Sequence, residues 1–116
     1  MAGMIRNAYT AVIARGDLWE AQVFTEPYEA AWAAEAVFFV HVMQATSGAG
    51  AVALARVQIS PDGMRWVDEG AEMKIAANAG SLSFARVANF GGWLRLDITV
   101  PPQASIQVVA TLALKA

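Results

Sequence analysis

Hydrophobic and polar residues alternate regularly in the second half of the chain. The segments WLRLDITV (93–100) and ASIQVVATLALK (104–115) both place aliphatic side chains at every second position. A period of two residues is typical of a strand with one buried face. Pro101 and Pro102 separate the two segments, and proline cannot donate a hydrogen bond within a sheet. We therefore expect an antiparallel hairpin formed by these two strands.

Shorter extended segments precede this pair. AVALARVQIS (51–60) places Val57 and Ile59 on one side, and SPDG (60–63) supplies a turn in which proline and glycine favour the required backbone angles. Further extended segments and the turns ANAGS and NFGG follow. Turns recur about every 8–12 residues, which is typical of a β-sandwich or small barrel.

The segment AVFFVHVMQAT (36–46) is apolar on both faces. A strand that is covered on both sides has this composition. We expect one face to lie in the core and the other to contact another subunit, and we assign the contact to Phe38, Val40 and Val42.

The first part of the chain has a weaker pattern. Pro27, followed by several alanines, is a suitable helix start, so one short helix near residues 26–36 stays open beside a non-helical conformation. We expect residues 1–10 to form an N-terminal arm and residues 11–116 to form a single domain. The predicted fold class is all-β, an antiparallel β-sandwich of jelly-roll-like form.

The composition adds a reason to expect self-association. Of the 116 residues, 57% are hydrophobic and 16% are charged, against about 45–50% and 25% in typical soluble domains. The longest apolar stretch, residues 30–43, contains Glu35 and His41 and is too short to cross a bilayer as a helix. We therefore expect the excess apolar surface to be buried in a homo-oligomer, and no membrane as a partner.

Charge and cysteine content narrow the function classes further. The formal net charge is −2, there is no cysteine, and the arginines are scattered singly. Nucleic-acid binding requires clustered basic residues, so we do not expect it. The N-terminal stretch is a poor signal peptide because Arg15 and Asp17 interrupt it, and we expect the protein in a virion or in the cytoplasm.

Candidate catalytic groups are few. His41 is the one histidine, and its apolar surroundings favour a core or interface position over a general base. Asp62, Asp68, Glu69 and Glu72 cluster in sequence but match no calcium-loop spacing. We predict no catalytic residue, no metal site, no cofactor and no enzymatic activity.

The aromatic residues leave two interpretations open. Trp66 and Trp93 would suit stacking on sugar rings, or they would pack at the ends of the core and at subunit contacts. Arg95 and Asp97 share the Trp93 face of their strand and could fix the register of a contact through paired charges. These four residues are the candidate binding residues, for either an interface or a ligand.

The stretch VQISPDGMRWVDEG (57–70) resembles two groups of proteins. Its S-x-D-G-x-x-W turn is similar to that of discoidin-like galactose-binding sandwiches, although these domains are longer and often carry paired cysteines. The turn, the apolar strand before it and the two strands after it also resemble small phage and virus-like structural proteins over most of the chain. That resemblance implies a structural subunit of a capsid, decoration or tail component, with other virion proteins as possible partners. A carbohydrate-binding module is the alternative.

Overall fold

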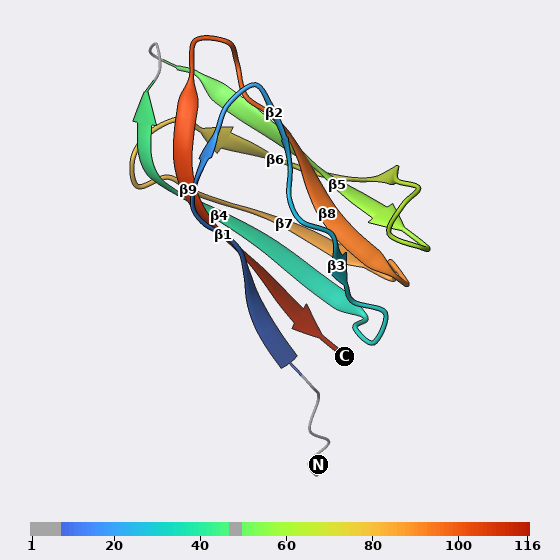
Figure 1. Ribbon diagram of the computed structural model, residues 1–116. Coiled ribbons are helices and arrows are strands. Elements are labelled where there is room, and N and C mark those ends of the chain that lie inside the picture. The colour runs from blue at the N-terminus through green and yellow to red at the C-terminus, as the bar shows by residue number, and fades with distance from the viewer. Residues whose placement is uncertain (1–7, 47–49) are drawn as a thin grey trace.

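The computed structural model describes residues 8–46 and 50–116, which form two antiparallel β-sheets packed as layers (Figure 1). The strands are β1 (Ala8–Trp19), β2 (Gln22–Phe24), β3 (Tyr28–Glu29), β4 (Glu35–Thr46), β5 (Val52–Ser60), β6 (Val67–Ala76), β7 (Leu82–Ala88), β8 (Trp93–Thr99) and β9 (Ser105–Lys115). The four-stranded sheet has the order β1-β9-β4-β7. The five-stranded sheet has the order β2-β8-β5-β6, and β3 also pairs with β8. The prediction of an all-β antiparallel sandwich is confirmed.

The core lies between the two sheets and is filled by the alternating inward residues of the long strands. Leu94, Leu96 and Ile98 of β8 are completely buried, as are Ile106 and Leu112 of β9. Each such side chain stabilises the fold by about 1.5–3 kcal/mol relative to an exposed position. β8 and β9 each have strands on both sides within their sheet. Their alternation of apolar and polar residues is the clearest in the sequence because every second side chain enters the core.

The predicted hairpin is wrong. β8 pairs with β5, β2 and β3, whereas β9 pairs with β1 and β4 in the other sheet. The turn at Pro101–Gln103 carries the chain across from one sheet to the other, and the Ala104 N–H donates to the Pro101 carbonyl 2.9 Å away. A period of two shows which face of a strand is buried, but not which sheet it joins.

The short helix that the sequence left open near residues 26–36 does not form, because no helix occurs in the part of the chain that the structure describes. Tyr28 pairs with Leu94 and Glu29 with Trp93, so this segment extends along β8. Ala30 and Ala33 then pack into the core, and the small size of alanine lets the connection lie close to the sheets.

The N-terminal strand begins earlier than the expected arm allows. Residues 8–10 belong to β1, where Ala8 pairs with Lys115 and Tyr9 with Leu114. The rest of the predicted arm lies outside the described residues. β9 thus runs between β1 and β4, and Figure 1 shows its end beside the start of β1.

Candidate functional site

A compact turn organises one end of the five-stranded sheet. The Ser60 hydroxyl accepts hydrogen bonds from the N–H groups of Asp62 (3.2 Å) and Gly63 (2.8 Å). The Asp62 carboxylate in turn accepts from the N–H groups of Met64 and Arg65, both at 2.9 Å. These bonds, with that of Arg65 first, lower the pKa of Asp62 from 3.8 to about 2. Asp62 therefore has the structural role in the turn that the sequence indicated.

Two glycines let this turn approach the start of β8. A Cβ atom on Gly92 would lie 2.5 Å from the Ser60 carbonyl oxygen, and one on Gly63 would lie 3.1 Å from the Trp93 ring. Gly63 also has a φ of 78°, which favours glycine. The Trp93 indole is half-buried because it lies over the turn.

Trp66 instead takes part in a stack around Arg95. The Arg95 guanidinium carbon lies 4.3 Å from the centroid of the Trp66 ring and 4.2 Å from that of Phe24. Its Nε donates to Gln58 Oε1 at 2.8 Å, and Gln58 Nε2 donates to Asp68 at 2.9 Å. Burial lowers the pKa of Arg95, because removing water disfavours the charged form. The stack joins the short strand β2 to β8 and to the turn.

Asp97 lies two residues beyond Arg95 on the same outer face. Its carboxylate accepts a hydrogen bond of 3.1 Å from Gln22 Nε2 on β2. All four predicted binding residues therefore lie on or beside one face of the five-stranded sheet, and Trp66 and Arg95 are in contact. Phe24, Gln22 and Gln58 complete this surface. The sequence showed no sign of them, because their contacts depend on strand pairing across long sequence separations.

The tryptophans do not form one sugar-binding platform. Trp19 is buried in the core with 2% exposure, and Trp32 lies in the connection before β4. One face of the Trp66 ring and one face of the Phe24 ring contact Arg95. A sugar ring on this surface would therefore be confined to the opposite face of either ring.

The assignment of Phe38, Val40 and Val42 to a subunit contact is wrong. These three side chains are at most 1% exposed, because they point into the core between the sheets. The alternate residues of β4 point outward, where Phe39 is 36% exposed. Both faces of this strand are apolar, so the pattern could not distinguish the inner face from the outer one.

The outer face of the four-stranded sheet carries a row of apolar side chains. Pairing places Val12, Thr111, Phe39 and Phe84 in one row across β1, β9, β4 and β7. The Phe39 and Phe84 rings are 6.4 Å apart, and the Arg86 guanidinium lies 5.2 Å from the Phe84 centroid. The next row contains Arg15, Val109, His41 and Leu82. His41 is exposed on this face and does not lie in the core. We call the apolar members of these rows, Val12, Phe39, Phe84, Val109 and Leu82, the outer apolar face.

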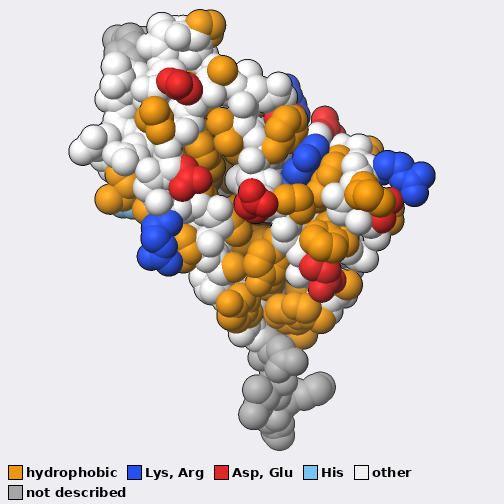
Figure 2. Space-filling model, viewed as in Figure 1, with side chains coloured by type: hydrophobic (Ala, Val, Ile, Leu, Met, Phe, Trp, Pro, Cys, Tyr) orange, Lys and Arg blue, Asp and Glu red, His pale blue; other side chains and the backbone are white. Residues whose placement is uncertain are grey.

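Figure 2 shows a mixed distribution of side chains over the side of the molecule that it presents. Apolar side chains gather in the lower part of the view, and acidic and basic ones are scattered.

The described residues contain no group of three or more His, Cys, Asp or Glu residues that could hold a metal ion. Within residues 8–46 and 50–116 there is also no helix with the length and apolar character needed to cross a membrane.

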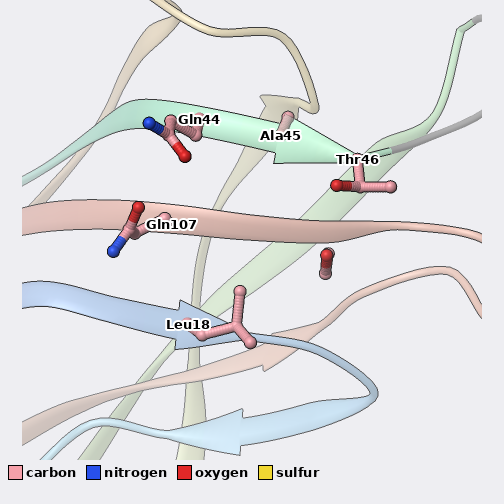
Figure 3. A pocket seen from close by; sticks show the side chains of 6 residues that line it. Leu18, Gln44, Ala45, Thr46 and Gln107 are labelled. Atoms are coloured by element: carbon pink, nitrogen blue, oxygen red, sulfur yellow. The ribbon is translucent and has the colours of Figure 1, made fainter.

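Two hollows on the surface were considered as binding sites for a small ligand. One of about 80 Å³ lies on the four-stranded sheet, between Leu18 of β1, Gln44 and Thr46 of β4, and Gln107 of β9 (Figure 3). Ligand pockets usually have volumes of about 300–1,000 Å³, so this hollow is too small for a sugar ring. A second hollow, of about 400 Å³, lies at the end of β7 and is lined by Glu35, Val37, Arg86, Val87 and Ala88.

Comparison with solved structures shows a similar fold in the SPBc2 prophage-derived protein YomS. The superposition has a TM-score of 0.65 and covers 100% of this chain and 99% of that chain, with 7% sequence identity. At this identity the likeness shows the fold alone. No protein-family model matches the sequence, and no curated protein matches it.

Proposed function

We propose that the protein is a structural subunit of a phage-related particle and that it assembles with copies of itself. The observation that carries this proposal is the outer apolar face. Its exposed members include Val12 (43%), Phe39 (36%), Leu82 (66%) and Phe84 (53%). The outer face of an antiparallel sandwich is normally polar, and a contiguous apolar patch favours contact with another protein surface.

The other sheet provides an internal comparison. Its outer face carries Arg95, Asp97, Gln58 and Asp68, which bond to one another or to neighbouring strands. These four polar side chains thus have partners within one chain. Most of the large apolar side chains that are exposed among the described residues belong to strands of the four-stranded sheet, so we propose that sheet as the contact surface.

The arrangement of the strands and the likeness to a solved structure both support the proposal that the protein is a component of a particle. Apart from the short β3, eight strands divide equally between two packed sheets with the orders β1-β9-β4-β7 and β2-β8-β5-β6, and we interpret this arrangement as a jelly roll, an architecture that recurs in viral capsid domains. The likeness to a prophage-derived protein fits the same role. A capsid, decoration or tail position, and other virion proteins as partners, are compatible with the proposal. We propose no enzymatic activity and no nucleic-acid or membrane partner.

A matched pair of variants tests the contact surface. Light scattering coupled to size-exclusion chromatography measures the mass of the wild-type protein, Phe39→Lys and Val52→Lys, and electron microscopy shows any particle. Val52 is 44% exposed at the start of β5 in the other sheet. We expect a wild-type oligomer, at least a tenfold loss of oligomer in Phe39→Lys, and a change of less than twofold in Val52→Lys. Circular dichroism confirms that both variants fold.

Two results would contradict the proposal. One is a wild-type protein that stays monomeric at high concentration. The other is an oligomer that Val52→Lys disrupts as strongly as Phe39→Lys does. A monomer whose elution shifts with glycans, and which loses this shift in Trp66→Ala, would favour the carbohydrate-binding alternative.

A further inference from the structure

The two sheets have open edges, and most of these are unsuited to pairing with another strand. β1 has register shifts between Val12 and Ala14 and between Arg15 and Asp17. β2 and β3 contain three and two residues. β6 has a register shift opposite β5 and carries acidic residues at Asp68, Glu69 and Glu72. Bulges, short length and charge are the features that protect sheet edges from other chains.

β7 lacks these features. Its seven residues, LSFARVA, pair with β4 without any register shift. Arg86 is its one charged residue. A regular apolar edge strand of this kind is a template for another strand.

The hydrogen bonds at the ends of β7 show which backbone groups face the open edge. The Val42 N–H donates to the Ser81 carbonyl at 2.9 Å, and the Asn89 N–H donates to the Ala34 carbonyl at 3.0 Å. In an antiparallel pair, alternate residues bond to the same neighbour. The odd-numbered residues of β7 therefore bond to β4. The N–H and C=O groups of Leu82, Phe84, Arg86 and Ala88 point away from β4.

We propose that β7 pairs antiparallel with β7 of a second copy, about a two-fold axis at Ala85. This inference rests on the proposed self-assembly and adds an edge contact to the one that we propose for the outer apolar face. In this register Leu82 lies opposite the partner's Ala88, and Phe84 lies opposite the partner's Arg86. The even-numbered residues form the hydrogen-bonded pairs, as their outward backbone groups require. The two four-stranded sheets become one continuous sheet of eight strands.

The side chains favour this register over its neighbours. An axis at Arg86 would place two guanidinium groups opposite each other, which is destabilising. An axis at Phe84 would place Leu82 opposite the partner's Arg86. The axis at Ala85 instead brings each Arg86 to a second Phe84 ring, and a guanidinium over an aromatic face is an attractive contact already present within the chain at 5.2 Å.

The hollow at the end of β7 gives independent support. It has a volume of about 400 Å³ and is lined by Val37, Arg86 and Ala88, among others. Because the partner's Leu82 lies opposite Ala88 in the proposed register, its side chain would enter this hollow. Leu82 is 66% exposed within one chain, so the contact would bury an otherwise solvated leucine.

Single cysteines test the register, because the chain has no cysteine of its own. The two Ala85 residues would form a non-hydrogen-bonded pair with Cα atoms about 4.5 Å apart, within the range of a disulfide. Ser83 lies two residues away on the same side of the strand, and its two copies would be about 14 Å apart. After mild oxidation, we expect Ala85→Cys to form a covalent dimer at least ten times more abundantly than Ser83→Cys.

A charge exchange tests the same register without a cysteine. Phe84→Arg would place an arginine opposite the partner's Arg86 on both sides of the axis, and we expect the dimer to be lost. Adding Arg86→Glu would restore it, because each new arginine would face a glutamate of the partner. An axis at Phe84 would give no such rescue, since the two introduced arginines would face each other.

The outcomes separate this inference from the proposed function. A wild-type oligomer that Phe39→Lys disrupts, but in which Ala85→Cys cross-links no better than Ser83→Cys and Arg86→Glu gives no rescue, overturns the β7 contact alone. A monomeric wild-type protein overturns both. Circular dichroism of each variant establishes that it folds, and if Ala85→Cys does not fold, the charge exchange decides.

Discussion

Thr25 offers a sharp test of how the edge of the five-stranded sheet is held. It follows β2 and is 6% exposed. Its N–H donates to the Leu96 carbonyl at 3.0 Å, and its hydroxyl oxygen accepts from the Leu96 N–H at 2.9 Å. Thr25→Val has nearly the same shape but lacks the acceptor. The Leu96 N–H would then be buried without that partner, which costs about 1–3 kcal/mol.

Thermal unfolding followed by circular dichroism measures this cost. For a domain of this size, 1 kcal/mol corresponds to about 4 °C in Tm, so we expect Thr25→Val to lower Tm by about 4–12 °C. Thr25→Ser keeps the hydroxyl and loses one methyl group, worth about 0.8 kcal/mol, or about 3 °C. Hydrogen exchange at the Leu96 amide should become faster in the valine variant alone. A valine variant at least as stable as the serine variant would refute the role of this hydrogen bond.

Two further predictions concern the turn beside Trp93. Gly92→Ala should lower the free energy of unfolding by about 1–3 kcal/mol, because its Cβ would lie 2.5 Å from the Ser60 carbonyl oxygen; chemical denaturation measures this, and an unchanged midpoint would contradict it. The Asp62 carboxyl should titrate near pH 2 in the folded protein, below its ordinary value of 3.8. Its stabilising contribution is therefore complete above the unfolded pKa and is lost as pH falls toward the folded one. The stability difference between wild type and Asp62→Asn should shrink over that window, and carbon NMR of the carboxyl group checks the midpoint.

Sequence patterning predicted the class of fold well because the two central strands are covered on one face by the opposite sheet. The buried series Leu94, Leu96 and Ile98 shows this regularity directly. The pairing of the strands could not be predicted from this alternation. β8 and β9 have the same pattern although they belong to different sheets, since pairing is decided by contacts between distant segments.

Because strand pairing could not be predicted, some residues of the candidate sites could not be predicted either. Trp93, Arg95 and Asp97 became candidates because they face away from an apolar series, and Trp66 became one because it follows the turn at residues 60–63. Phe24 was not found, because its contact with Arg95 depends on a strand of three residues. On β4, Phe38 and Phe39 have equal apolar character. Only the position of the opposite sheet determines that Phe38 is inside.

The place of β9 has a consequence for biosynthesis. This strand separates β1 from β4, yet its residues are translated after both of them. While the ribosome is still adding residues 50 to 104, β1 and β4 have no common neighbour to join them, and their apolar residues remain available to chaperones. The four-stranded layer can close only after residue 115 has left the exit tunnel, so it is expected to form later than the pairing of β5, β6 and β8 in the other sheet.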